Sequence, residues 1–235
     1  MQLSAIITSR ALAFIDVNEI LSGGNIYFPD VSKILASEFD FQKVPARPEE
    51  FNMGEGVEFK LGRNKAVVIE RIAIFYGLVL LETKSTTEVS QQTLLEVFRT
   101  VFSKMNISFS EELIKRWAFI SFLTFYTDFP LLAEYSDPLK LLAEKTTKAV
   151  SQIFNEDLKY EPLEIKIGHE PNLRKNDIAS FTIQHRLGTR FSENKYYSEA
   201  PLPTDLHLQL LQEFERDVIK NRKLPKRDKR RLKGR

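Results

Sequence analysis

The chain has 235 residues, with 43% hydrophobic and 28% charged residues, values that are typical of a soluble globular protein. This composition excludes collagen-like, disulfide-stapled and fully disordered proteins. Because the sequence has no cysteine, it also excludes a thiolate zinc site and a cysteine nucleophile.

Charge is distributed unevenly along the chain. Residues 220–235 hold ten basic residues and one acidic residue, which gives this segment a charge of +9. The other 24 basic and 31 acidic residues give residues 1–219 a charge of −7, so the whole chain is +2. We therefore predict a single globular domain over residues 1–219, followed by a basic, flexible C-terminal tail over residues 220–235.

The N-terminal residues do not have the pattern of a targeting segment. They lack a basic region and a long apolar stretch, and Asp16 and Glu19 follow soon after. The longest apolar stretch, Trp117 to Tyr126, is shorter than the about 20 residues of a membrane helix. We therefore expect a cytoplasmic protein with no membrane segment.

Strands and turns dominate the predicted first third of the chain. Apolar runs predict strands over residues 3–8 and 11–20, and residues 22–25 have the composition of a turn. Asp30 is expected to cap a helix of two turns that ends near Glu38. Further strands are predicted at residues 26–28, 39–41 and 57–61, with a loop over 45–56 and a turn over 62–65.

The clearest sheet signal is a β-hairpin over residues 66–84, with its turn at Tyr76-Gly77. After it, apolar residues at spacings of three and four predict an amphipathic helix over residues 88–105. Ser108 or Ser110 can begin a short turn, and residues 117–126 predict a buried strand.

Two helices are predicted in the second half of the chain. Asp137-Pro138 is a strong helix start, and one apolar face then extends to about residue 155, formed by Leu139, Leu142, Thr146, Ala149 and Ile153. The last helix begins at Pro203, and its predicted apolar stripe is formed by Leu206, Leu210, Phe214 and Val218.

Strands over residues 158–167 and 181–187 and a polar loop over 172–177 complete the pattern. Hairpins outnumber βαβ candidates in this order of elements. The sequence therefore predicts an α+β fold with a mixed, mainly antiparallel sheet and helices packed on its faces.

Glu82-Thr83-Lys84 is the first candidate for chemistry. This short segment resembles the strand motif of PD-(D/E)xK nucleases. The resemblance implies a catalytic group of Glu82, Lys84 and, across the hairpin, Glu70, with Mg²⁺ as the cofactor. No Pro-Asp precedes the hairpin where that family has one, and the alternative interpretation is an ion pair at a solvated strand end.

Residues 184–201 form the second candidate, an exposed loop rich in basic and aromatic side chains. Arg186, Arg190 and Lys195 can bind phosphate or carboxylate groups, and Tyr196 and Tyr197 can stack on bases or enter a protein interface. The alternative is an ordered loop whose tyrosines seal the edge of the core.

Other catalytic and metal patterns are missing from the sequence. His169, His185 and His207 have no metal-ligand spacing, and His207 is expected to be exposed in the first turn of its helix. The sequence also lacks a nucleophile elbow, a Walker motif and a dinucleotide-binding glycine pattern.

The basic tail is the third candidate. Its central cations can displace counterions from DNA or RNA, and these are Lys226, Arg227, Lys229, Arg230 and Arg231. The leading hypothesis is therefore a non-enzymatic binding or adaptor subunit that contacts a protein partner, while its tail contacts nucleic acid. It needs no cofactor, and homo-oligomerisation stays open. The alternative hypothesis is the metal-dependent nuclease.

Overall fold

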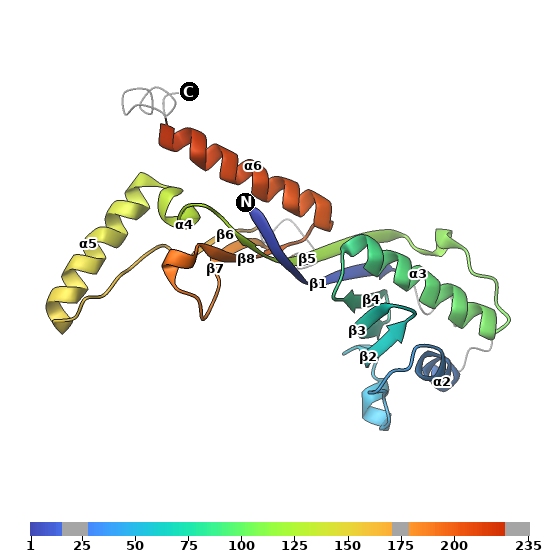
Figure 1. Cartoon of the computed structure of the whole chain (residues 1–235). Coiled ribbons are helices and arrows are strands. Elements are labelled where there is room, and N and C mark those ends of the chain that lie inside the picture. The colour runs from blue at the N-terminus through green and yellow to red at the C-terminus, as the bar shows by residue number, and fades with distance from the viewer. Residues whose placement is uncertain (16–27, 171–178, 224–235) are drawn as a thin grey trace. The chain divides into compact units, whose positions relative to one another are not determined.

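A computed structural model describes residues 1–15, 28–170 and 179–223 of the chain. Within these ranges, eight strands form one antiparallel sheet and five α-helices accompany it, which confirms the predicted α+β class (Figure 1). The strands are β1 (Gln2–Phe14), β2 (Val57–Asn64), β3 (Val67–Phe75), β4 (Leu78–Thr83), β5 (Arg116–Tyr126), β6 (Glu164–Ile167), β7 (Phe181–His185) and β8 (Lys195–Ala200). The helices are α2 (Phe28–Glu38), α3 (Thr87–Lys104), α4 (Leu131–Glu134), α5 (Asp137–Phe154) and α6 (Thr204–Lys223). The strand order is β2-β3-β4-β1-β5-β8-β7-β6.

The described residues form two compact units, and both units are discontinuous in sequence. Of the described residues, unit 1 takes 1–5, 123–170, 179–200 and 205–223, and unit 2 takes 6–15, 28–122 and 201–204. Strands β1 and β5 therefore contribute residues to both units.

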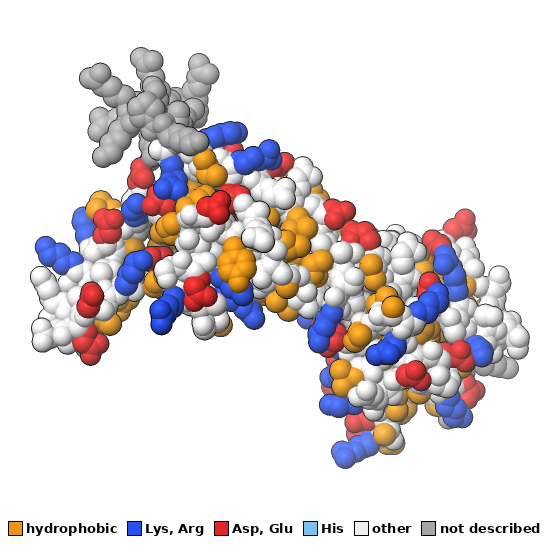
Figure 2. Space-filling model, viewed as in Figure 1, with side chains coloured by type: hydrophobic (Ala, Val, Ile, Leu, Met, Phe, Trp, Pro, Cys, Tyr) orange, Lys and Arg blue, Asp and Glu red, His pale blue; other side chains and the backbone are white. Residues whose placement is uncertain are grey.

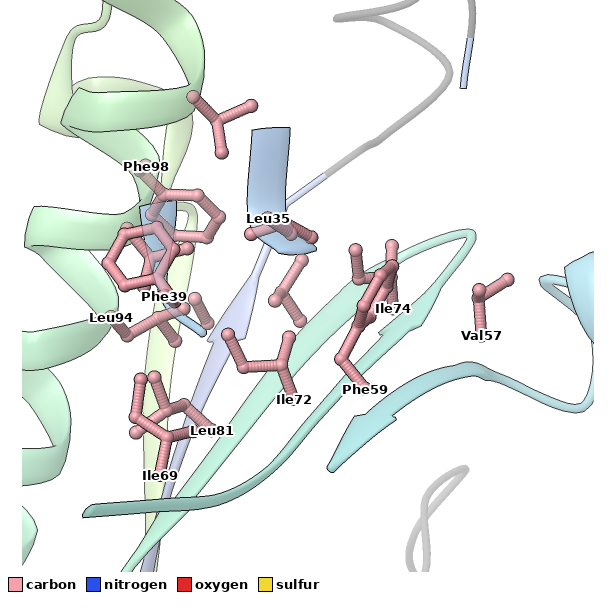
Figure 3. Close-up of a cluster of buried hydrophobic side chains, with 14 of the residues drawn as sticks. Leu35, Phe39, Val57, Phe59, Ile69, Ile72, Ile74, Leu81, Leu94 and Phe98 are labelled. Atoms are coloured by element: carbon pink, nitrogen blue, oxygen red, sulfur yellow. The ribbon is translucent and has the colours of Figure 1, made fainter. Parts of the chain in front are cut away.

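Unit 2 has its core between one face of the sheet and helix α3. Figure 3 shows Leu94 and Phe98 of α3 pointing toward Ile69, Ile72 and Leu81 of the hairpin. These five side chains are all buried, and each fully buried apolar side chain of this size contributes about 1.5–3 kcal/mol to folding. Apolar residues on α3 and on β3 and β4 therefore supply the main stabilisation of this unit.

The predicted hairpin and the helix that follows it are confirmed. Strands β3 and β4 pair antiparallel around Tyr76-Gly77, and α3 covers residues 87–104. The Thr86 side chain caps α3 by accepting from the backbone N–H of Val89 at 3.4 Å. A short 3-10 turn over Glu111–Leu113 begins after Ser110, as predicted.

The predicted strand at residues 39–41 is wrong, and the turn predicted at 62–65 lies at residues 65–66, because β2 continues to Asn64. Gly62 lies inside β2, and a Cβ atom there would lie 2.4 Å from Cε1 of Phe41. The glycine in the strand therefore makes room for the Phe41 ring, which packs over the backbone while residues 39–41 turn. A second short 3-10 turn covers Pro48–Phe51 within the predicted loop.

The two strands predicted at residues 3–8 and 11–20 are one strand, β1, which is described as far as Phe14. Helix α2 confirms the helix expected near Asp30. It also includes Phe28, which was predicted to be extended. The parts of these predictions over residues 16–27 lie outside the described residues.

In unit 1, strands β6, β7 and β8 pair antiparallel. The prediction that residues 184–201 form a loop is wrong, because β8 occupies residues 195–200 and a 3-10 turn covers Phe191–Glu193. The strand predicted over 158–167 is confined to β6, and β7 ends at His185. The loop predicted over 172–177 lies outside the described residues.

Helix α6 buries only part of the predicted stripe, because Val218 is buried and Phe214 is half-buried. Leu206 and Leu210 are exposed, whereas the buried positions are Thr204, His207, Leu211, Glu215 and Val218. Three of the buried side chains are polar. The Thr204 hydroxyl accepts from the backbone N–H of Thr87 at 3.0 Å within unit 2, and the other two have partners in unit 1. Glu215 accepts from the amino group of Met1 at 2.6 Å, and the His207 ring bonds the Ser198 hydroxyl at 2.8 Å.

Candidate protein-docking surface

Helix α5 of unit 1 is the one α-helix of the described residues that buries none of its side chains. It begins at Asp137-Pro138 and ends at Phe154, and its C-cap Asn155 adopts the left-handed conformation with φ of 51°. The exposed fractions of its exposed large apolar side chains are 41% at Leu139, 51% at Leu141, 60% at Leu142, 76% at Ile153 and 64% at Phe154.

The hydrogen bonds of α5 with the chain that follows it are made by hydroxyl groups, on a side that also carries the half-buried Ala143 and Val150. The backbone N–H of Tyr160 donates to the hydroxyl of Thr147 at 2.9 Å, and the N–H of Leu158 donates to the hydroxyl of Ser151 at 3.1 Å. Figure 1 shows the chain after α5 returning along the helix toward β6. This return segment therefore attaches the helix without covering its exposed apolar side.

An ion pair fixes the first turns of α5. Lys140 donates to Glu134 of α4 at 2.7 Å, and this carboxylate raises the pKa of the Lys140 ammonium. Arg222 of α6 lies 3.5 Å from the same carboxylate. Glu134 of α4 therefore connects α4 to α5 through Lys140 and to α6 through Arg222.

The uncovered apolar side of α5 is a narrow line of residues, which we call the α5 stripe: Leu139, Leu142, Thr146, Ala149 and Ile153. Their spacings of three and four residues place them on one face of the helix. Leu139, Leu142 and Ile153 leave roughly 350 Å² of the stripe's apolar surface in solvent, taking about 200 Å² for each fully exposed side chain. This size is within the range of the largest apolar patch on a monomeric protein, and such patches are often functional.

Further exposed apolar side chains lie on and before β6. Leu163 and Ile167 are both exposed, and β6 is the last strand in the order of the described sheet. Strand β6 pairs with β7 along one of its edges. In the sequence, these residues follow the segment that returns from α5.

The stripe residues were predicted as one face of a helix, but sequence reasoning did not identify them as a binding surface. The apolar periodicity of α5 is as regular as that of a core helix. The pattern within α5 therefore does not distinguish a covered face from an uncovered one.

The basic residues predicted at 184–201 lie around the β7–β8 turn. The backbone N–H of Arg186 donates to the carbonyl of Lys195 at 2.9 Å, and the N–H of Arg190 donates to the Glu193 carboxylate at 2.8 Å. The Lys195 ammonium lies 4.9 Å from the centre of the Tyr126 ring, and its hydrogen bond lowers the pKa of the Tyr126 hydroxyl. Arg190 is exposed, whereas Arg186 and Lys195 are half-buried.

Tyr196 is not the exposed contact that the loop prediction required. Its side chain is buried, and its ring stacks on Phe125 with the ring centres 5.6 Å apart. The Tyr196 hydroxyl accepts from the backbone N–H of Leu131 at 2.9 Å, and burial raises its pKa. Tyr196 therefore joins β8 to the start of α4, while Tyr197, on the opposite face of β8, is half-buried.

His207 is also placed differently from its prediction. It was expected to be exposed, but its side chain is fully buried beside the Phe181 ring, with the ring centres 5.2 Å apart. Burial lowers the pKa of His207 to about 4, so the ring is neutral at pH 7. The Ser198 hydroxyl donates to the Thr182 carbonyl at 2.7 Å, so the His207 ring donates to Ser198.

The predicted nuclease group is occupied by ion pairs in unit 2. Glu82 lies 2.5 Å from the Nε of Arg10 and 3.7 Å from Arg71, while Glu70 pairs with Lys84 at 3.1 Å. Glu70 lies at the register shift between β3 and β4. The two carboxylates therefore take part in different ion pairs, and the nuclease hypothesis stays a prediction.

Glu82 belongs to a row of charges across the sheet of unit 2. On β2, Glu58 pairs with Lys60 and, at 2.9 Å, with Arg71, and these cations lower the pKa of the Glu58 carboxyl. Arg10, at the other end of the row, lies 4.8 Å from the centre of the Phe122 ring. Figure 2 shows acidic and basic side chains interspersed over the visible face of each unit.

A cavity of about 80 Å³ lies between α2, α3 and the hairpin in unit 2. Its lining is entirely apolar and includes Leu35, Ile72, Phe98 and Met105. Ligand sites combine apolar walls with a few polar groups that orient the ligand, so this cavity lacks the second component.

Across the described ranges, no group of three acidic or histidine side chains could hold a metal ion. In the same ranges, no helix is long and apolar enough to span a membrane. The tail residues Lys226, Arg227, Lys229, Arg230 and Arg231 lie outside the described residues, although α6 includes the start of the predicted tail as far as Lys223. No protein family model matches the chain, and no curated protein matches its sequence.

Proposed function

We propose that this protein works by binding another polypeptide chain through the α5 stripe. The observation that carries the proposal is that an 18-residue amphipathic helix is attached to its unit along a different side, which leaves Leu139, Leu142 and Ile153 of the stripe in water. Solvated apolar surface of this kind is unfavourable at about 25 cal/mol for each Å². A binding partner that covers the stripe recovers this free energy.

The ion pairs around Glu134 support this function. They fix the start of α5 before a partner arrives, so less conformational entropy is lost on binding than for a helix that folds on its partner. Exposed Leu142 and Ile153, three turns apart, are then the main anchors.

A site-specific photocrosslinker tests this function in cells. Placed at Leu142 in the full chain, it should yield discrete covalent adducts, and an added Ile153→Glu change should abolish them. The matched control is the same crosslinker at Lys148, an exposed residue on the opposite side of α5, which should yield none. Absence of adducts at Leu142, or equal adducts at both positions, would contradict the proposal.

A second proposed function is contact of the basic segment with nucleic acid. The observation that favours it is the charge of +9 over residues 220–235, given by ten basic residues and one acidic residue. Of these, Lys220 lies 3.5 Å from Asp217 and Arg222 pairs with Glu134, so the remaining cations carry the proposal.

The test is the retention of the full chain on immobilised double-stranded DNA and on RNA as salt increases. Retention should fall steeply with salt concentration, because each phosphate contact releases counterions. Deletion of residues 224–235 should remove most of the retention at low salt and flatten this dependence. Equal retention of the deleted and full chains would exclude the segment as the contact.

A further inference from the structure

The α5 stripe is suited to pairing with an antiparallel copy of itself. Its spacings of three, four, three and four residues are the spacings of a coiled-coil seam. When the direction is reversed, Leu142 lies opposite Ile153 of the second copy, and Thr146 lies opposite Ala149 of the second copy. The large side chains thus meet near the two ends of the contact, and the small side chains meet at its centre, where the helices approach most closely.

The residues beside the stripe are compatible with this register. Lys145, on one flank, comes opposite Gln152 of the second copy, a neutral polar side chain. Glu144 and Lys148 lie on the far side of the helix and stay in solvent. The pairing therefore brings no like charges directly together, and a two-fold axis between residues 147 and 148 generates both halves of the contact.

The available area is suited to a weak dimer that forms as concentration increases. The stripes of two copies together would bury roughly 700 Å² of apolar surface, which is below the about 1,000 Å² of a stable, specific protein interface. An interface of this size is consistent with association at micromolar rather than nanomolar concentration.

We infer that α5 is a dimerisation helix, and that two copies of this chain associate through antiparallel α5 stripes. The inference rests on the proposed function, because it names the partner for the same surface. The contact is isologous, so it closes after two copies and leaves no stripe exposed.

Sedimentation velocity of the full chain at about 1 to 100 μM tests the association. The wild-type protein should shift from a monomer of 27.2 kDa to twice that mass as its concentration increases. Leu142→Glu should remain monomeric throughout, whereas Lys148→Glu should dimerise like the wild type. Because α5 buries no side chain, the circular dichroism spectra of both variants should match that of the wild-type protein. A wild-type monomer at every concentration, or a dimer unaffected by Leu142→Glu, would overturn the inference.

Disulfide trapping tests the orientation, and the absence of native cysteine makes the test specific. The double variant Leu142→Cys with Ile153→Cys should form a covalent dimer on mild oxidation. The single variant Leu142→Cys should not, because residues 142 and 153 are 11 positions, or about 16 Å, apart along the helix. A disulfide dimer formed by the single variant would indicate parallel pairing and contradict the antiparallel assignment.

The photocrosslinking and sedimentation results distinguish the two proposals. If crosslinks from Leu142 connect the chain to a different protein while the purified chain stays monomeric, the dimer is wrong and the docking surface remains. If neither crosslinks nor dimers form, both proposals fail.

Discussion

Helices α3 and α5 have the same length and very different surroundings. Each has 18 residues and an amphipathic pattern, but α3 buries nine residues and α5 buries none. Leu94 and Phe98 of α3 pack against the hairpin of unit 2, whereas Leu142 and Ile153 of α5 face solvent. An apolar stripe therefore shows that a helix has a side to be covered, but it does not show whether the same chain supplies the cover.

The largest expected effect comes from truncating the same residue type on the two helices. Leu94→Ala should reduce the free energy of unfolding by about 3 kcal/mol, because it leaves a cavity in the core of unit 2. Leu142→Ala should change it by less than about 0.5 kcal/mol in dilute protein. Urea unfolding followed by Trp117 fluorescence reports on unit 2, and circular dichroism reports on the helices. Equal losses in the two variants would show that α5 is covered within the monomer.

Histidine 207 extends the comparison from apolar to polar burial. Its pKa is about 4 in the folded protein and about 6.5 in the unfolded chain, so the unfolded chain takes up the proton first as pH falls. The stability that depends on neutral His207 is complete above pH 6.5. It is lost progressively toward pH 4, by about 3 kcal/mol in total. Urea unfolding at several pH values should show that His207→Gln removes this part of the pH dependence, while His169→Gln, at an exposed position, retains it. The same pH slope in His207→Gln would refute this assignment.

A single hydroxyl group provides a sharper comparison of a buried and an exposed position. Tyr196→Phe leaves the buried backbone N–H of Leu131 without its acceptor and should cost about 1–2 kcal/mol. Tyr76→Phe, at the exposed hairpin turn, should have an effect close to zero. Thermal unfolding by circular dichroism measures both, and an unchanged midpoint for Tyr196→Phe would mean that the hydrogen bond contributes little.

The smallest expected losses of stability come from replacing the two carboxylates of the hairpin, Glu82 and Glu70. Glu82→Gln weakens contacts with Arg10 and Arg71 and should cost about 1 kcal/mol, whereas Glu70→Gln should cost less than about 0.5 kcal/mol because Lys84 is exposed. Urea unfolding measures both losses. The same variants test the nuclease hypothesis: Mg²⁺-dependent cleavage of plasmid DNA that Glu82→Gln abolishes would establish a catalytic role instead.

Local patterns explain which parts of the fold could be predicted. The hairpin around Gly77 and helix α3 follow from apolar runs, one turn and regular spacing, and the structure confirms them. The start of α5 at Asp137-Pro138 was also predictable, because proline fits the first turn of a helix.

The misplaced elements depend on partners that are distant in sequence. The buried face of α6 includes His207 and Glu215, whose partners are Ser198 and the amino group of Met1. Apolar periodicity assigns such residues to solvent. Strand β8 was missed for a related reason, because Ser198 occupies one of its buried positions and interrupts the apolar alternation.

For the α5 stripe, the helix itself was predicted correctly, but its exposure to solvent was not. Its residues were identified correctly as one helix face, but their exposure depends on where the chain goes after Asn155. The hydrogen bonds from Leu158 and Tyr160 to hydroxyl groups of α5 draw the return segment to a different side of the helix, and periodicity within α5 contains no information about them.

The division of the chain between the two units has a consequence for biosynthesis. Apart from residues 201–204, all of unit 2 leaves the ribosome before most of unit 1 has been translated. The bond between Met1 and Glu215 spans 214 positions. Met1 can therefore form this bond only after helix α6 has been translated. Translation proceeds at about 5–20 residues per second, so the synthesis of these residues takes at least about ten seconds. Unit 2 can fold during this time, while unit 1 is still incomplete. Pulse-labelled ribosome-bound chains should therefore acquire protease resistance in unit 2 first.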